Sequence, residues 1–173
     1  EASGDVNFMQ GALLATNDRA LLRNYSNQVT SFQVGRTTGQ YQVLAGDVAA
    51  NYSPLSSNLG LRGVMGQLKL GGLSFSTHMG TVAESWDALT NRSTLTGLPA
   101  RSTYLRDVAG LKLDYETAPG FHVFATSQAY ADRSGSLGGT AGGNSSGFAL
   151  KAAETQSSTA GVAYQGTDWQ ATL

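Results

Sequence analysis

Apolar and polar residues alternate with a period of two along most of the chain. The clearest run covers residues 68–79, where Gly71-Gly72 stands between two alternating segments and fits a two-residue hairpin turn. Residues 109–116 alternate in the same way, 117–120 has turn composition, and 121–128 returns as a second strand. This period predicts strands with one apolar and one polar face. In the first run the apolar face carries Leu68, Leu70, Leu73, Phe75 and Met79.

Connection lengths give the topology. The pattern predicts strands at 6–15, 28–36, 41–49, 61–70, 73–82, 105–116, 121–131, 157–165 and 167–173. The connections between them alternate between long and short throughout. Outer-membrane barrels have this arrangement, with short turns at one rim and long loops at the other. A sandwich with Greek-key crossings has no reason to place every long loop at one end.

The expected fold is therefore all-β, an antiparallel up-and-down transmembrane β-barrel over residues 1–173. Most of the predicted strands approach the 9–11 residues that a tilted spanning strand needs. The odd strand number, and an end in mid-strand without a terminal aromatic residue, favour a segment of a larger barrel. The Gly/Ser-rich stretch 132–156 is expected to be a mobile loop.

The amino-acid composition limits the classes of fold and function that fit the chain. Charged residues make up 13% of the chain, hydrophobic residues 40%, and 22 residues are glycine. That balance suits strands with one polar uncharged face. The net charge of −1 gives no field that would attract nucleic acid, and the absence of cysteine excludes disulfides and thiolate metal sites. No apolar run is long enough for a membrane helix.

One stretch has a more particular pattern. Gly46-Asp47 ends a predicted strand, a polar loop with Tyr52-Ser53-Pro54-Leu55 follows, and Leu61-Arg62-Gly63 opens the next strand. The chain as a whole resembles bacterial outer-membrane β-barrels as a class, and this stretch resembles large secretion barrels such as fimbrial ushers. The resemblance implies the barrel class and no residue roles.

Charged residues and histidine on the polar faces are the candidate functional residues. In a barrel they would line the lumen, where charge tunes selectivity. Arg62 and Asp107 share the phase of apolar neighbours, but both lie near strand ends, where the penalty for facing lipid is small. The lumen-facing candidates are Lys69, His78, Lys112, Asp114 and Glu116.

Aromatic residues gather near the predicted strand ends, where an interfacial girdle would place them. Ordinary strand propensity also enriches aromatics, so both interpretations stay open. The residues concerned are Tyr41, Trp86, Tyr104, Tyr115, Tyr130, Tyr164 and Trp169.

Catalytic and metal-binding patterns are weak. Residues 143–147 match the G-x-S-x-G elbow, but no strand-turn-helix context surrounds them. His78 and His122 lie in separate predicted hairpins, unlike the clustered ligands of a metal site. We therefore expect no catalytic residue, no metal and no cofactor, and the protein is not expected to be an enzyme.

The function expected from these patterns is an outer-membrane β-barrel for transport, secretion or passive permeation. Its partners would be outer-membrane lipid, with further barrel strands or other envelope proteins, and no nucleic acid. The alternative is a secreted or surface-attached all-β protein: an adhesin, a carbohydrate-binding module or a subunit of a surface assembly.

Overall fold

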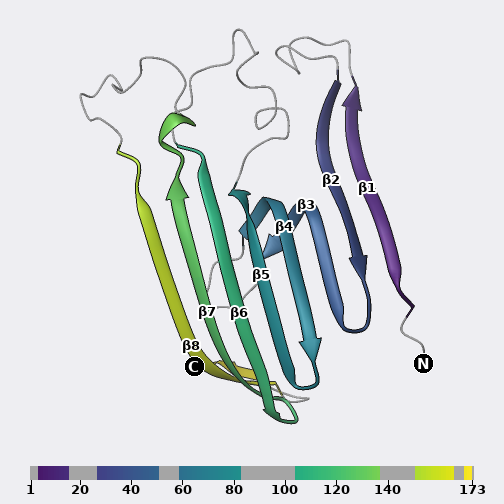
Figure 1. Ribbon diagram of the computed structural model, residues 1–173, viewed down its shortest axis with the longest axis vertical. Helices are drawn as coiled ribbons and strands as arrows, with labels where there is room; N and C mark the ends of the chain where they lie inside the picture. Colours follow the sequence, from purple (N-terminus) through teal and green to yellow (C-terminus); the bar gives the residue numbers. More distant parts are fainter. Residues whose placement is uncertain are drawn as a thin grey trace.

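The computed structural model describes residues 4–15, 27–50, 59–82, 104–136, 151–165 and 170–172. These residues form one antiparallel sheet of nine strands, and the strands lie side by side in sequence order (Figure 1). A short 3₁₀ turn, η2 (Ser134–Ser136), follows β7. The strands are β1 (Val6–Ala15), β2 (Asn27–Thr37), β3 (Tyr41–Ala50), β4 (Leu59–Leu70), β5 (Leu73–Val82), β6 (Arg106–Ala118), β7 (Phe121–Asp132), β8 (Glu154–Gln165) and β9 (Gln170–Thr172).

The predicted all-β, up-and-down order is confirmed. The bounds of β1 and β5 match the predicted strands 6–15 and 73–82, while β8 begins three residues before the predicted 157. The described turns between β2 and β3, β4 and β5, and β6 and β7 are short and lie at one end of the sheet (Figure 1). We call this the turn end and the other the loop end. Much of the predicted loop 132–156 lies outside the described residues.

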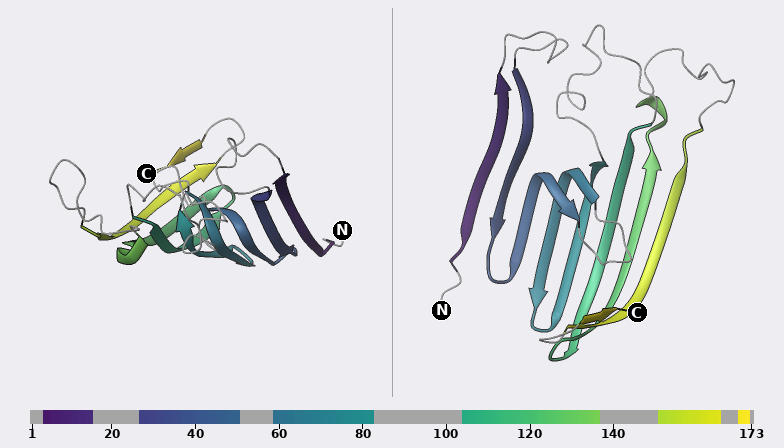
Figure 2. Two further views of the ribbon diagram at one scale, coloured as in Figure 1. Left: turned by 90° about the horizontal axis from the view of Figure 1, so that it is seen from above. Right: turned by 180° about the vertical axis from the view of Figure 1, so that it is seen from behind.

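The sheet is not closed into a barrel. Among the described residues β1 pairs only with β2, and β9 pairs only with β8, so these two strands lie at opposite edges. Seen from above, the sheet is curved, with one concave face (Figure 2). Alternation and connection lengths predict which strands are neighbours. Closure depends on the number of strands and their stagger, which those patterns do not report.

The two faces of the sheet differ in chemistry. We call the concave face, which carries Leu44, His78 and Val108, the inner face, and the opposite one the outer face. Among the described residues, every exposed large hydrophobic residue except Val6 lies on the outer face by strand register. These outer residues are Met9, Leu13, Val29, Phe32, Val34, Val43, Val64, Leu68, Leu70, Leu73, Phe75, Met79, Leu111, Leu113, Tyr115, Phe121 and Val123.

Buried apolar side chains gather on the inner face near the loop end. There they remove apolar surface from water, which is the main favourable term in folding. Toward the turn end the same face becomes polar. The buried members of the cluster are Leu44, Val48, Ala50, Leu61 and Val108, and partly buried Phe8, Leu59, Met65, Val82 and Tyr130 pack against them.

Within the part of the chain that the structure describes, no helix has the length and apolar character that a membrane-crossing helix requires.

Candidate functional site

Three glycines lie in one row across β3, β4 and β5. Gly46 is directly opposite Gly63, and Gly63 is opposite Gly80. A Cβ on Gly63 would collide with the carbonyl oxygen of Met79 and would lie 2.5 Å from the Cα of Gly80. Gly46 has a backbone φ of 113°, which residues with a Cβ rarely adopt. The row therefore permits a sharp bend that larger residues would prevent, and we call it the glycine crease.

Beyond the crease, β3 and β4 leave the line of β2. The pairing of β2 with β3 stops at Gln33 and Gly46. The Asp47 carboxylate accepts a hydrogen bond of 2.7 Å from the backbone N–H of Phe32, which keeps that donor satisfied where the ladder ends. Residues 47–50 and 59–62, here called the folded ends, turn over toward the concave side (Figure 2).

The folded ends are packed against the inner face. Val48 and Leu61 are cross-strand partners, each 3% exposed, and both belong to the buried cluster that contains Val108 of β6. Gly80 lies between Gly63 and Val108 in register, and a Cβ there would lie 2.6 Å from a Leu61 methyl carbon. The crease thus makes room for Leu61 in the space that a β5 side chain would occupy.

A row of polar residues crosses the outer face next to the crease. Arg62 pairs with Asp47 at 2.9 Å, and the Thr81 hydroxyl donates to Asp107 at 2.7 Å. Arg133 binds both carboxylate oxygens of Asp107, at 2.7 and 3.0 Å. This polar row borders the apolar outer face at its loop end. The Gly46-Asp47 and Leu61-Arg62-Gly63 sequences lie opposite each other, and each contributes one glycine to the crease and one charged residue to the ion pair.

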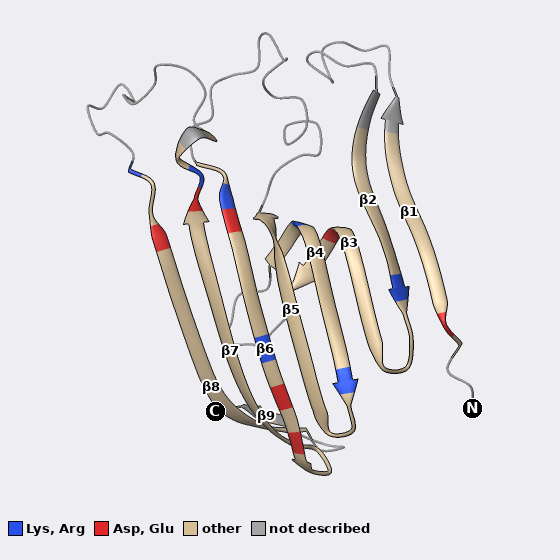
Figure 3. Cartoon of the chain, in the orientation of Figure 1, with Lys and Arg blue, Asp and Glu red and all other residues tan. Residues whose placement is uncertain are grey.

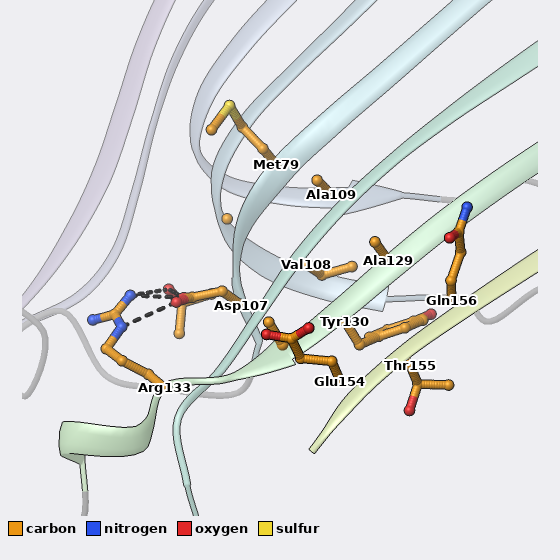
Figure 4. Close-up of a pocket in the computed structure, with 13 residues that line it drawn as sticks. Met79, Asp107, Val108, Ala109, Ala129, Tyr130, Arg133, Glu154, Thr155 and Gln156 are labelled. Carbon is orange, nitrogen blue, oxygen red and sulfur yellow. Dashed lines mark hydrogen bonds and ion pairs between the residues drawn. The ribbon is translucent and has the colours of Figure 1, made fainter. Parts of the chain in front are cut away.

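A groove of about 810 Å³ lies beside the polar row on the outer face. The small side chains of Ala109, Ala129 and Ala131 lie along it, with Met79 at one side and Gln156 at the other (Figure 4). Nearby, the hydroxyls of Ser127 and Ser158 are 3.2 Å apart. The outer face is thus less apolar over the loop-end half of β7 and β8 than elsewhere.

Charged residues on the inner face concentrate on β6, whereas the middle of most other strands is uncharged (Figure 3). Asp114 contacts Lys112 at 3.2 Å and the Nδ1 of His122 at 2.8 Å. The Lys112 ammonium also lies 5.6 Å from the centre of the Phe124 ring. The Glu116 carboxylate accepts the backbone N–H of Gly120 in the turn. Asp114 thus contacts Lys112 and His122 within this face, whereas Glu116 is bound to the backbone of the turn.

The other two predicted lumen residues lie apart from this cluster. Lys69 is exposed on the inner face at the turn end of β4. His78 is on the same face but only 2% exposed, and its ring lies over Gly110 beside Gln128. The structure places all five candidates on one face and brings Lys112 and Asp114 together. Their role in lining a lumen stays a prediction.

Sequence reasoning missed the contact of His122 with Asp114 and the ion pair between Arg106 and Asp132, 2.9 Å. The two-residue turn at 119–120 could have predicted the first contact, because a tight turn there brings His122 close to Asp114 on the neighbouring strand. Asp132 ends β7 beyond the polar row, and its hydrogen bond from the Arg106 guanidinium lowers the pKa of that carboxyl.

The described residues were compared with the requirements of a metal site. Among them, no group of three or more His, Asp or Glu side chains could hold a metal ion. The G-x-S-x-G match at 143–147 lies outside the described residues.

Comparison of the chain with protein-family models, with curated proteins and with solved structures found no match.

Proposed function

We propose that this chain forms part of an outer-membrane β-barrel that serves transport, secretion or passive permeation. One observation carries the proposal: the exposed large hydrophobic residues of an up-and-down sheet share its outer face, with the polar row at the loop end. In water such a face would be a large aggregation-prone patch. Facing lipid, the same side chains form the apolar belt of a barrel wall.

The height of the apolar face fits a membrane. From Arg62 in the polar row to Leu70 at the turn there are eight residue steps, which at about 3.4 Å each give about 27 Å of strand. At the tilt of ~40° found in membrane barrels this projects to about 21 Å, close to the ~25 Å apolar band of known barrels.

Aromatic side chains support a membrane boundary at the turn end of the sheet. By register Tyr41, Tyr115 and Tyr164 point to the outer face in the turn-end halves of their strands. Tyr130, in contrast, is on the inner face and donates a hydrogen bond to Gln128. Three of the predicted girdle residues thus hold positions where an interfacial belt would have them.

Insertion also requires that the two edges of the sheet be paired. Hydrocarbon cannot satisfy backbone N–H and C=O groups, so open sheet edges do not occur in contact with lipid. In the inserted form, the edges at β1 and β8–β9 therefore meet each other or pair with further strands. The sheet described here is then an arc of the barrel wall.

Detergent dependence tests the proposal. The full chain, refolded from urea into detergent micelles and into liposomes, is expected to be β-rich by circular dichroism and to float with the liposomes. In plain buffer it is expected to aggregate, because the outer face has nothing to cover it.

A chain that is monodisperse and β-rich in plain buffer, and that stays at the bottom of the flotation gradient, contradicts the membrane proposal. That result would support the surface-attached or secreted all-β alternative.

A further inference from the structure

We infer that the groove beside the polar row on the outer face holds one membrane phospholipid with a zwitterionic phosphoethanolamine head group. The inference rests on the proposed function, because it takes the outer face to be in contact with lipid. It goes further by naming the chemistry of a bound molecule and the two side chains that select it. Arg133 lies beside the phosphate, Glu154 binds the ammonium group, and an acyl chain follows the floor of the groove.

The first argument is the shape and accessibility of the groove. Its volume of about 810 Å³ lies within the range of ~300–1,000 Å³ that is common for small-molecule sites. Ala109, Ala129 and Ala131 line it with exposed, short side chains. Farther along β6 on the same face the exposed side chain is the large Leu111. The outer face is therefore hollow where alanine stands in place of a large residue, and the hollow is open to its surroundings.

The second argument is the position of the groove between polar and apolar surface. Ala131 is opposite Asp107 of the polar row, and Ala129 is two residues closer to the turn end. One end of the groove thus meets charged side chains, and the rest continues onto the apolar outer face. In the proposed barrel wall, this places a lipid head group at the first end and an acyl chain along the rest.

The third argument is the charge at the polar end. The carboxylates of Asp107 and Glu154 line this end together with the guanidinium of Arg133 (Figure 4). Arg133 binds Asp107 through Nε and Nη2, so its Nη1 takes no part in those bonds. Among the described residues, Glu154 has no ion-pair partner. The rim therefore carries net negative charge, with one guanidinium nitrogen for a phosphate and one carboxylate for a cation.

The head group, and not the acyl chain, decides which lipid binds. Bilayer hydrocarbon is as apolar as the groove, so an acyl chain gains little by moving from one to the other. Phosphoethanolamine offers its ammonium to Glu154 and its phosphate to the Nη1 of Arg133. An anionic head group is repelled by the excess carboxylate, and a choline head group has no N–H to donate. Phosphatidylethanolamine is therefore expected to bind best and phosphatidylglycerol worst.

Native mass spectrometry of the full chain, refolded in detergent micelles, tests the inference. Phosphatidylethanolamine, phosphatidylcholine and phosphatidylglycerol with the same acyl chains are added in equal amounts, and the lipid retained by the folded chain is measured. We expect one phosphatidylethanolamine per chain, retained about fivefold more often than phosphatidylglycerol, which is the size of effect that one exposed ion pair can give.

Two variants test the two parts of the site. Ala129→Leu fills the groove and is expected to lose most of the retained lipid. Its matched control is Ala125→Leu, which adds the same side chain to the same face of β7 outside the groove and is expected to retain as much lipid as the wild type. Glu154→Gln keeps the size of the side chain and removes its charge, so it is expected to retain phosphatidylethanolamine and phosphatidylglycerol equally. Circular dichroism checks that each variant is folded.

The outcomes separate the two proposals. If the wild type floats with liposomes but has no preference for phosphatidylethanolamine, or if Glu154→Gln keeps the preference, the lipid site is wrong and the barrel stands. The same holds if Ala129→Leu retains as much lipid as Ala125→Leu, or if it converts a dimer into a monomer, which would make the groove a contact between copies. If Ala129→Leu does not fold, Glu154→Gln decides alone. A chain that does not insert overturns both proposals.

Discussion

The two faces of this sheet are built by the same strands, yet they place different demands on the residues. On the outer face, neighbours such as Val64, Met79 and Leu111 are exposed and differ in shape. On the inner face near the loop end, Val48, Leu61 and Val108 are buried beside glycines that admit no Cβ. The apolar part of the outer face therefore requires only that its side chains be apolar. The buried part of the inner face also requires side chains of a particular size.

The largest effect is expected at the crease. Gly63→Val places side-chain atoms against the carbonyl of Met79, and neither strand can move without breaking the ladder, so we expect a loss of about 3 kcal/mol or more of unfolding free energy. Urea titration of the chain in micelles, followed by tryptophan fluorescence, measures it. Gly66→Val on the outer face of the same strand meets only a Thr77 methyl at 3.7 Å and is expected to cost less than about 1 kcal/mol. Equal costs would show that the crease is not needed.

A charge on the outer face comes next. Leu111→Lys puts an ammonium into the apolar belt and is expected to cost about 2–4 kcal/mol in liposomes if the position lies near the bilayer midplane. Ser157→Lys on the inner face faces water in the proposed barrel and is expected to be nearly neutral. Refolding yield and urea midpoint in liposomes compare the two variants. If the inner-face lysine is the more harmful one, the assignment of the faces is reversed.

The smallest effect concerns two ion pairs of similar exposure on opposite faces, Asp47 with Arg62 and Asp114 with Lys112. Arg62→Ala leaves the Asp47 carboxylate at the border of the apolar belt, at an expected cost of about 1–2 kcal/mol. Lys112→Ala leaves Asp114 with His122 and a polar surrounding, and less than about 1 kcal/mol is expected. Urea unfolding in micelles measures both. If the two variants lose the same unfolding free energy, the surroundings of Asp47 in the polar row are no less polar than those of Asp114 on the inner face.

Much of the architecture could be predicted from the order of residues. Strand positions follow from alternation, and the turn at Gly71-Gly72 follows from its composition. The faces also follow, because successive side chains in a strand point to opposite sides. This is why Lys69, His78, Lys112, Asp114 and Glu116 were placed on one face and the structure has them there.

The rest needed distances between strands that are far apart in sequence. Gly46, Gly63 and Gly80 are unremarkable one by one and become a crease only when the register aligns them. His78 has the alternation of an exposed polar residue, yet packing over Gly110 buries it. Chain order alone determined the strands, their succession and their two faces, because these depend on local periodicity. Tertiary structure decided the bend, the buried cluster and the open edges, because these depend on which atoms of neighbouring strands compete for the same space.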